Sequence, residues 1–251
     1  MSGHSKWSSI KHQKGAADAR RGQLFTKLTR EIIVAVREGG TDPTANYRLR
    51  LAVQRARDNN MPLDNIERSI KRGSGEVEGA IYFEMVLEGY GPGGTAILVE
   101  ALTGNRNRTL QDVRTVFSRN GANMGESGCV AWLFESKGLI RVVTSNLDSD
   151  ELTLQAIDAG ADDVNIEDTD MEIYTKREEL EIVRTALEQN QVPISSAELA
   201  MIPKTMISLD EKASLQTLKL LDKLEELDEV QHVSSNADFT DAVLAAYQVQ
   251  S

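Results

Sequence analysis

Residues 81–102 read IYFEMVLEGYGPGGTAILVEAL, and this stretch decides the fold class. Two apolar runs, 81–87 and 95–102, flank the glycine-rich GYGPGG, a pattern typical of an antiparallel β-hairpin. No Gly-Lys-Ser/Thr follows the glycines, so a tight turn is favoured over a loop that cradles phosphate. Upstream of the hairpin apolar residues recur at helical spacing, whereas strands and helices mix downstream. The sequence therefore predicts a multidomain α+β protein.

Three helices are expected before the hairpin, over residues 16–38, 44–58 and 62–72. Gly39 and Gly40 are predicted to end the first helix, and Gly73 the third, while Pro62 suits a first helical position. Because the connections are short, the three helices predict a small N-terminal bundle.

After the hairpin, Leu110, Val113 and Phe117 mark a helix, and residues 129–134 are predicted to form a further buried strand. The elements from residue 138 onward follow the order βαββαβ, which is the ferredoxin-like pattern. The last three elements, a helix, a short strand and a helix, are expected to complete the sheet begun at residue 81. The predicted domains are a basic tail (1–20), a helical bundle (21–78), an α+β domain (79–137 plus 204–251) and an inserted ferredoxin-like domain (138–203).

Composition excludes several classes of protein. The chain has 251 residues, of which 40% are hydrophobic and 27% charged, so it can bury a core of ordinary size. Cys129 is the single cysteine, which excludes an intrachain disulfide and a cysteine-based zinc site, and it is expected to be buried and inert. No apolar run approaches the roughly 18 residues that span a bilayer. A cytoplasmic protein with no membrane partner is therefore expected.

Charge is distributed unevenly along the chain. The formal net charge is -11, yet residues 1–75 contain 15 Lys and Arg against 7 Asp and Glu, a balance of +8. Residues 76–251 carry -19, and most of that acid lies after residue 141. A basic head on an acidic body predicts a nucleic-acid surface on the head, with the body repelling the same ligand.

Basic side chains of the tail and of the first two helices form this predicted surface, where they would contact phosphates without reading sequence. A merely solvated helix face is the alternative. Trp7 is expected either to stack on an unpaired base or to dock on the bundle. The predicted nucleic-acid-binding residues are Lys6, Trp7, Lys11, Lys14, Arg20, Arg21, Lys27, Arg30, Arg48 and Arg55.

Arg106 and Arg108 form a possible anion site. Both lie at the predicted start of a helix, where cations oppose the macrodipole, so something should offset the cost. Pairing with Glu88 or Glu100 is one explanation, and an external anion such as a nucleic-acid phosphate is the other.

Catalysis finds little support in the sequence. His4 and His12 lie in the tail and His232 lies far away, so no spacing resembles a metal site. The acidic residues between 148 and 172 are interpreted as a solvated face. No catalytic residue, metal or cofactor is predicted, and the chain is expected not to be an enzyme.

Several motifs together resemble the YebC/PmpR family, which includes the mitochondrial translational activator of cytochrome c oxidase. They run nearly end to end: GHSKW at 3–7, Phe25 with Lys27, Gly39-Gly40 before Asp42-Pro43, Asn60-Met61-Pro62, EGYGPGG at 88–94 and NRNRT at 105–109. Relatives often carry paired glycines where this chain has Gly121-Ala122. The resemblance implies a cytoplasmic three-domain protein with a helical first domain and a ferredoxin-like third domain inserted in the second.

The resemblance implies two functions, since family members are described both as DNA-binding transcriptional regulators and as translation factors on the ribosome. We expect a nucleic-acid-binding regulator of gene expression, with DNA-binding transcriptional regulation as the first hypothesis. A ribosome-associated translation factor that binds ribosomal RNA is the alternative, and the tail with Trp7 suits irregular single-stranded RNA. The sequence predicts no oligomeric state.

Overall fold

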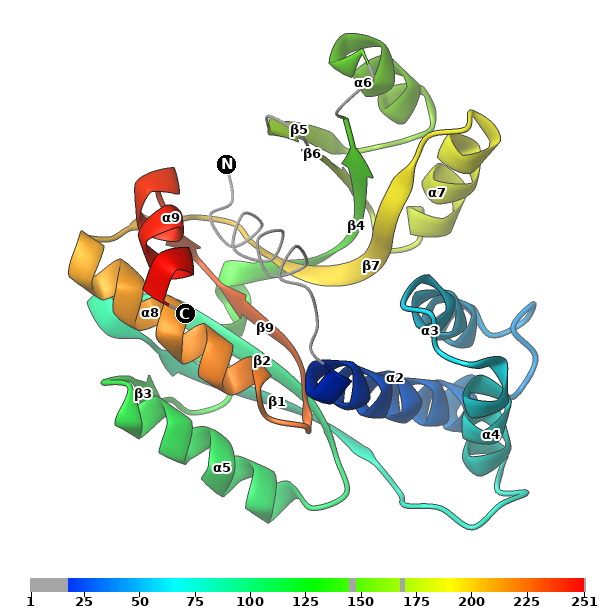
Figure 1. Cartoon of the computed structure of the whole chain (residues 1–251), viewed down its shortest axis with the longest axis horizontal. Coiled ribbons are helices and arrows are strands. Elements are labelled where there is room, and N and C mark those ends of the chain that lie inside the picture. Colours follow the sequence, from blue (N-terminus) through cyan, green and yellow to red (C-terminus); the bar gives the residue numbers. More distant parts are fainter. Residues whose placement is uncertain (1–17, 145–147, 168–169, 251) are drawn as a thin grey trace. The chain divides into compact units, whose positions relative to one another are not determined.

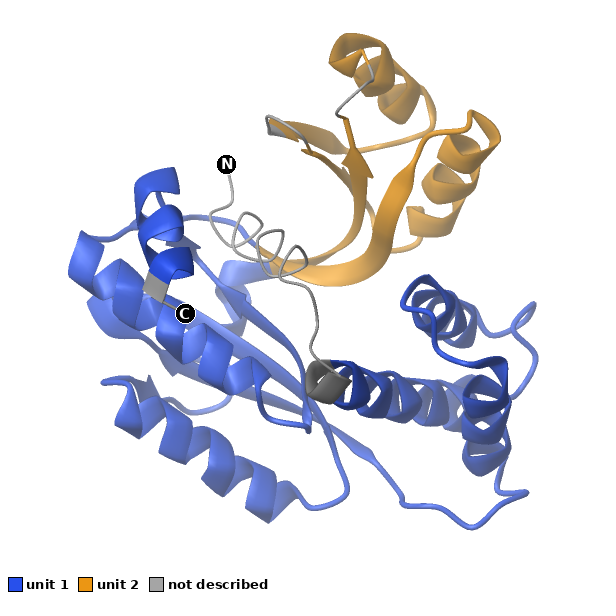
Figure 2. Ribbon diagram, viewed as in Figure 1, with its two compact units in different colours: residues 1–134, 203–251 blue, residues 135–202 orange. Residues whose placement is uncertain are grey.

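The computed structural model describes residues 18–144, 148–167 and 170–250 (Figure 1). The chain folds into two compact units, one of residues 1–134 with 203–251 and the other of residues 135–202 (Figure 2). The second unit thus interrupts the first along the sequence, as an α+β fold with an inserted domain requires. Residues 21–78 fall in the same compact unit as the α+β part, so their assignment as a separate domain stays a prediction.

Three helices open the first unit: α2 (Asp18–Gly39), α3 (Tyr47–Asp58) and α4 (Leu63–Ser74). Their apolar stripes face one another, and the shared core includes Leu28, Ile32, Leu49, Ala52 and Ile66. This packing confirms the predicted three-helix bundle.

The bounds of α4 correct two details of the prediction. Pro62 is the N-cap rather than the first helical residue, and α4 continues through Gly73 to end before Gly75, whose φ is +86°. Gly73 is buried, and a Cβ there would lie 2.7 Å from the Cβ of Val36 on α2. This glycine therefore permits the close approach of two helices instead of ending one.

The predicted hairpin is confirmed as β1 (Phe83–Tyr90) and β2 (Ala96–Thr103), which pair antiparallel around the 3₁₀ turn Pro92–Gly94. The remaining elements of this unit are α5 (Arg106–Arg119), β3 (Asn123–Met124), the 3₁₀ helix Ala131–Leu133, β8 (Ile207–Ser208), α8 (Glu211–Glu225), β9 (Val230–Ser235), β10 (Ala237–Asp238) and α9 (Asp241–Gln250).

The sheet has the order β3-β1-β2-β9, so the late strand β9 lies beside β2, as expected from the sequence. Leu87, Ile97 and Val99 from the sheet pack with Phe117 of α5 and Leu221 of α8 in one core.

The strand predicted over residues 129–134 is wrong. This segment is a turn followed by the 3₁₀ helix Ala131–Leu133, and β4 begins only at Phe134. The buried carboxylate of Glu88 accepts hydrogen bonds from the backbone N–H groups of Gly128, Val130 and Ala131, at 2.6, 2.8 and 2.8 Å. Because these donors converge on one side chain, the segment curls instead of extending along a neighbouring strand.

The inserted unit has the predicted ferredoxin-like element order and confirms that part of the fold. The elements are β4 (Phe134–Val143), α6 (Ser149–Asp158), β5 (Asp163–Glu167), β6 (Asp170–Thr175), α7 (Leu180–Gln189) and β7 (Ile194–Pro203). Their sheet has the order β5-β6-β4-β7, and β6 pairs antiparallel with both β4 and β5. The buried Arg141 guanidinium on β4 lies 3.1 Å from Glu172 on β6 and 3.2 Å from Glu198 on β7.

Candidate nucleic-acid interface

The predicted interface is only partly within the described residues. Lys6, Trp7, Lys11 and Lys14 lie outside them, and so does the side chain of Arg20. Of the residues that the structure places, Arg21 is exposed on the first turns of α2, with its guanidinium 5.9 Å from the centroid of the Phe25 ring.

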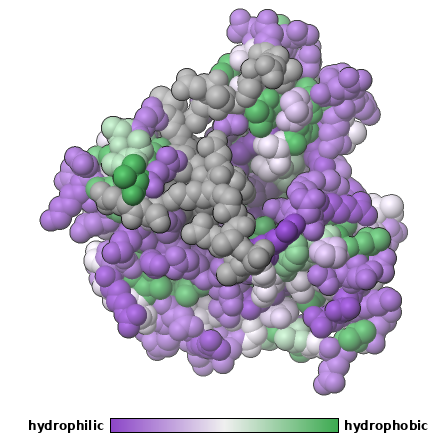
Figure 3. Space-filling view, in the orientation of Figure 1, coloured by the Kyte–Doolittle hydropathy of each residue, from purple (hydrophilic) through white to green (hydrophobic). Residues whose placement is uncertain are grey.

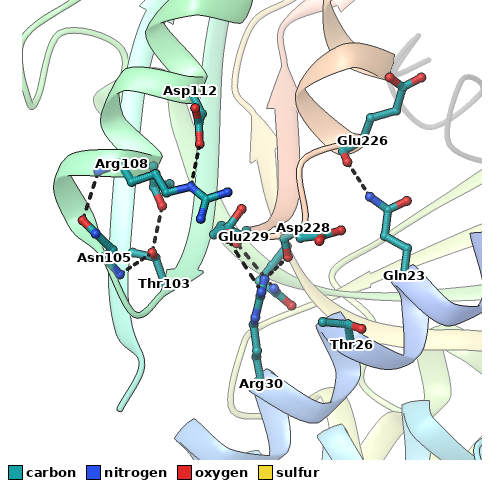
Figure 4. A network of polar contacts seen from close by, with 12 residues as sticks. Gln23, Thr26, Arg30, Thr103, Asn105, Arg108, Asp112, Glu226, Asp228 and Glu229 are labelled. Atoms are coloured by element: carbon teal, nitrogen blue, oxygen red, sulfur yellow. Dashed lines mark hydrogen bonds and ion pairs between the residues drawn. The ribbon is translucent and has the colours of Figure 1, made fainter. Parts of the chain in front are cut away.

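Lys27 and Arg30 point from α2 to the C-terminal end of α8 and the loop that follows it. The Lys27 ammonium donates to the carbonyl of Glu225 at 2.6 Å. The Arg30 guanidinium donates to the carbonyl of Asp228 and lies 3.7 Å from the Glu229 carboxylate (Figure 4). The side chains of Lys27 and Arg30 therefore connect the helical part to the α+β part of the same unit.

Arg48 and Arg55 make the same kind of connection from α3. Arg48 forms ion pairs with Glu38 and with Glu84 at the start of β1. Burial of Arg48 works against its charged form, but the hydrogen bond and charge of Glu84, helped by Glu38, raise the pKa of the guanidinium above its ordinary value. Arg55 lies 3.4 Å from Glu31 and donates to the ring of His232 on β9 at 3.1 Å.

These contacts give four of the predicted phosphate-binding residues a structural role that the sequence did not reveal. Their partners on the α+β part lie from 36 to 198 residues away along the chain, so no local pattern could indicate them. Phosphate contact by Lys27, Arg30, Arg48 and Arg55 stays a prediction.

Exposed cations also occur on the helices at positions that the predicted set omits. They are Arg37 of α2, Arg57 of α3, and Arg68 and Lys71 of α4. The sequence carried a signal for some of them, because Arg57 lies on the polar side of the predicted second helix. In the described residues these side chains offer charge to an external anion at the surface, which makes them candidates for phosphate contact.

Arg106 and Arg108 lie in the first turn of α5, where the sequence analysis placed them. Asn105 caps the helix by accepting from the backbone N–H of Arg108 at 3.1 Å. Arg108 is exposed and lies 3.6 Å from Asp112 one turn later, while the Arg106 guanidinium lies 4.9 Å from the centroid of the Phe83 ring. Figure 4 shows Arg108 turned toward Asp112 beside the Asn105 cap.

The proposed pairing of these arginines with Glu88 is wrong, because the Glu88 carboxylate is occupied by three backbone N–H groups. Those hydrogen bonds, working against the effect of burial, hold the pKa of Glu88 below its ordinary value. Glu100 lies opposite His232 in the β2–β9 register. An external anion at Arg106 and Arg108 stays a prediction.

Cys129 is half-buried instead of buried, because it lies in the turn and not in a strand. Burial, together with the charge of Glu88, raises the pKa of its thiol above the ordinary value. A thiol of this kind is a poor nucleophile at neutral pH.

Within residues 18–144, 148–167 and 170–250, no three His, Cys, Asp or Glu side chains gather in a way that could hold a metal ion. No helix in that described part is both long and apolar enough to cross a bilayer. The face drawn in Figure 3 is mostly hydrophilic, with hydrophobic residues in small separate patches.

The fold and the charges define a class: an α+β protein with a cationic helical head and an inserted ferredoxin-like unit. Two family models match this chain, the TACO1/YebC protein N-terminal domain over residues 5–76 and the TACO1/YebC second and third domain over residues 82–237. The chain belongs to the TACO1/YebC family.

Similar proteins from bacteria extend over almost the whole chain. A protein of Dehalococcoides mccartyi is 62% identical over 251 residues, which is 100% of both chains. One from Desulfosudis oleivorans is 53% identical over 97% of this chain and 99% of its own. Both are named "probable transcriptional regulatory protein". The crystal structure of a conserved hypothetical protein from Aquifex aeolicus superposes with a TM-score of 0.86 at 48% identity, covering 92% of this chain and 96% of that one.

Proposed function

We propose that this chain is a nucleic-acid-binding regulator of gene expression that binds DNA as a transcriptional regulator. The observation that carries the proposal is the separation of charge between parts of the fold. The helical head, residues 1–75, has a balance of +8, whereas the inserted unit, residues 135–202, has 5 basic and 16 acidic residues. The insert thus has a charge of -11, as large as that of the whole chain.

The positively charged head therefore attracts a polyanion such as DNA, and the negatively charged insert repels it. Exposed arginines and lysines on α2, α3 and α4 supply the phosphate contacts, together with the basic tail. Because the acidic insert repels phosphate, the nucleic acid is directed to the head. The names of the bacterial relatives support transcriptional regulation as the process.

Backbone contact is favoured over reading of the major groove by α4. The first turn of α4 carries Asp64, and Glu67 follows on an exposed position. Carboxylates at the end of a helix that enters a groove face the phosphates with the wrong charge. In this proposal the head contacts the nucleic-acid backbone, and the protein acts in the cytoplasm by binding, without a catalytic step.

Binding of the whole chain to a fluorescent DNA duplex at several salt concentrations tests the proposal. Arg57→Gln and Arg68→Gln should each weaken binding, and each should reduce the slope of log affinity against log salt by about 0.9 per lost phosphate contact. Arg177→Gln is the matched control, because Arg177 is an exposed arginine of the acidic insert. Equal effects of all three changes would contradict a phosphate-binding head.

The target is identified by sequencing nucleic acid that is crosslinked to the protein in cells. Recovery of promoter DNA supports the proposed transcriptional role. Recovery of ribosomal RNA instead would replace it by the translational alternative.

A further inference from the structure

Two aromatic side chains lie exposed beside each other at one end of the first sheet. Tyr90 ends β1, and Trp132 lies in the 3₁₀ helix Ala131–Leu133. Their exposed fractions are 42% for Tyr90 and 66% for Trp132. Tryptophan side chains are usually well buried, so the large exposure of Trp132 is unusual and suggests a surface that binds a ligand.

Both rings are held by the same backbone oxygen. The Tyr90 hydroxyl donates to the carbonyl of Cys129 at 3.0 Å, and the Trp132 Nε1 donates to that same carbonyl at 3.1 Å. The O–H and N–H donors of the two rings are therefore satisfied within the protein. What they offer to a ligand is the flat face of each ring.

The turn that carries Trp132 is held in place by hydrogen bonds within the protein. The Glu88 carboxylate holds the turn through the N–H groups of Gly128, Val130 and Ala131. From the far end of the insertion, the backbone N–H of Lys204 donates to the carbonyl of Leu133 at 2.8 Å. Stacking on such rings costs little conformational entropy, because the loop is already ordered.

We propose that Tyr90 and Trp132 form an aromatic platform on which an unpaired nucleobase of single-stranded nucleic acid stacks. This inference rests on the proposed function and deepens it, by naming the form of nucleic acid that one part of the protein recognises. Every base has a π-face, so a platform whose N–H and O–H donors are already used accepts unpaired bases with little regard to sequence. A base inside a duplex keeps both faces against its neighbours and cannot use the platform.

The charges around the platform indicate stacking rather than phosphate attraction as its contribution. The Lys204 ammonium donates to the backbone carbonyl of Trp132 at 3.0 Å, so one cation lies at the backbone of the platform. The exposed Glu126, three residues before Cys129, brings an opposite charge to the same turn, while the Glu88 carboxylate is buried. Binding at this place should therefore depend only weakly on salt, unlike binding at the arginines of the head.

The experiment uses the whole chain with three probes: a uridine octamer, a thymidine octamer and a DNA duplex. Trp132→Ala should weaken binding of at least one octamer by about 5- to 150-fold, which corresponds to the stacking of one base, with no change for the duplex. The loss should be the same at low and high salt. Trp132→Phe keeps a flat ring, and should retain most of the affinity.

Phe83→Ala is the matched control, since Phe83 is an aromatic residue of β1 that is about as exposed as Tyr90, at 44%, but lies under Arg106. A 4-thiouridine octamer provides a second readout on the unchanged protein, and its crosslink should map to the peptide that holds Tyr90 or Trp132. A loss for the uridine octamer alone identifies RNA as the source, and a loss for the thymidine octamer identifies single-stranded DNA.

Three results would overturn the inference: unchanged octamer binding by folded Trp132→Ala, equal losses on octamer and duplex, or a crosslink confined to other peptides. If the chain binds the duplex through Arg57 and Arg68 but binds neither octamer, the platform is refuted while the proposed function stands. If none of the three probes binds, both fail.

Discussion

Replacing Asn46 by alanine is expected to destabilise the helical head more than a surface change of the same size. Asn46 is the N-cap of α3 and is buried between the end of α2 and the start of α3. Its Oδ1 accepts from the N–H of Leu49 at 3.0 Å, while its Nδ2 donates to the carbonyls of Ala35 and Gly40 at 2.7 and 2.8 Å. One side chain thus links two helices that carry the candidate phosphate contacts.

The expected magnitude follows from these three hydrogen bonds. Loss of an N-cap costs about 1 kcal/mol, and each further hydrogen bond contributes a net of about 0.5–1.5 kcal/mol. Asn46→Ala should therefore lower the free energy of unfolding by about 2–4 kcal/mol. Asn46→Asp keeps the capping oxygen but directs a carboxylate at two carbonyls, so it should be destabilising as well.

Urea denaturation followed by circular dichroism measures this loss as a lower midpoint at an unchanged slope. Gly39 offers a check on the geometry, because a Cβ at that position would lie 2.6 Å from the Cγ of Asn46. Gly39→Ala should therefore cost less in the Asn46→Ala background than in the natural chain. The reasoning is refuted if Asn46→Asp is as stable as the natural chain, or if the two changes are additive.

Three further predictions concern other parts of the structure. The pKa of Glu88 is lower in the folded protein than its ordinary value of 4.5. Its charge therefore stabilises the fold above pH 4.5, and this stabilisation is lost as the pH falls through the folded pKa. Glu88→Gln should have a lower free energy of unfolding than the natural chain at pH 7, and in urea melts this difference should shrink on acidification. Gly73→Ala should lower stability by about 1–3 kcal/mol despite its better helix propensity. Its cost should be smaller in a Val36→Gly background, because that change removes the Cβ that the new side chain meets. A thermal melt in which Gly73→Ala is stabilised contradicts the close helix contact. The raised pKa of the Cys129 thiol predicts slower alkylation by iodoacetamide at pH 8 than for a free cysteine peptide, and an equal rate would contradict it.

The candidate site was less predictable than the fold. The sequence placed Arg106 and Arg108 correctly at a helix start, because the helical spacing of Leu110, Val113 and Phe117 just after them is a local signal. It gave no indication that Lys27 contacts Glu225 or that Arg55 contacts His232. A basic residue on a polar helix face looks the same in sequence whether it faces solvent or a distant carbonyl.

Trp132 illustrates the same limit from the opposite side. Its apolar neighbours at 129–134 predicted a buried strand, but the segment curls around Glu88 and leaves the indole exposed. Glu88, which binds this segment, lies about forty residues earlier on β1. The hydrophobic pattern within residues 129–134 therefore could not indicate that contact. The aromatic platform therefore became visible only in the folded chain.

The sequence by itself determined the elements and their order: the helical head, the hairpin at GYGPGG and the βαββαβ insert. These depend on hydrophobic periodicity and on turn-forming residues, which act over a few residues and can be recognised in the sequence alone. The tertiary structure decided which charged side chains already have partners within the protein. It also decided that Gly73 must lack a side chain and that the Trp132 ring is exposed to solvent. Each of these depends on atoms brought together from distant parts of the chain, whose positions are set by packing of the whole core.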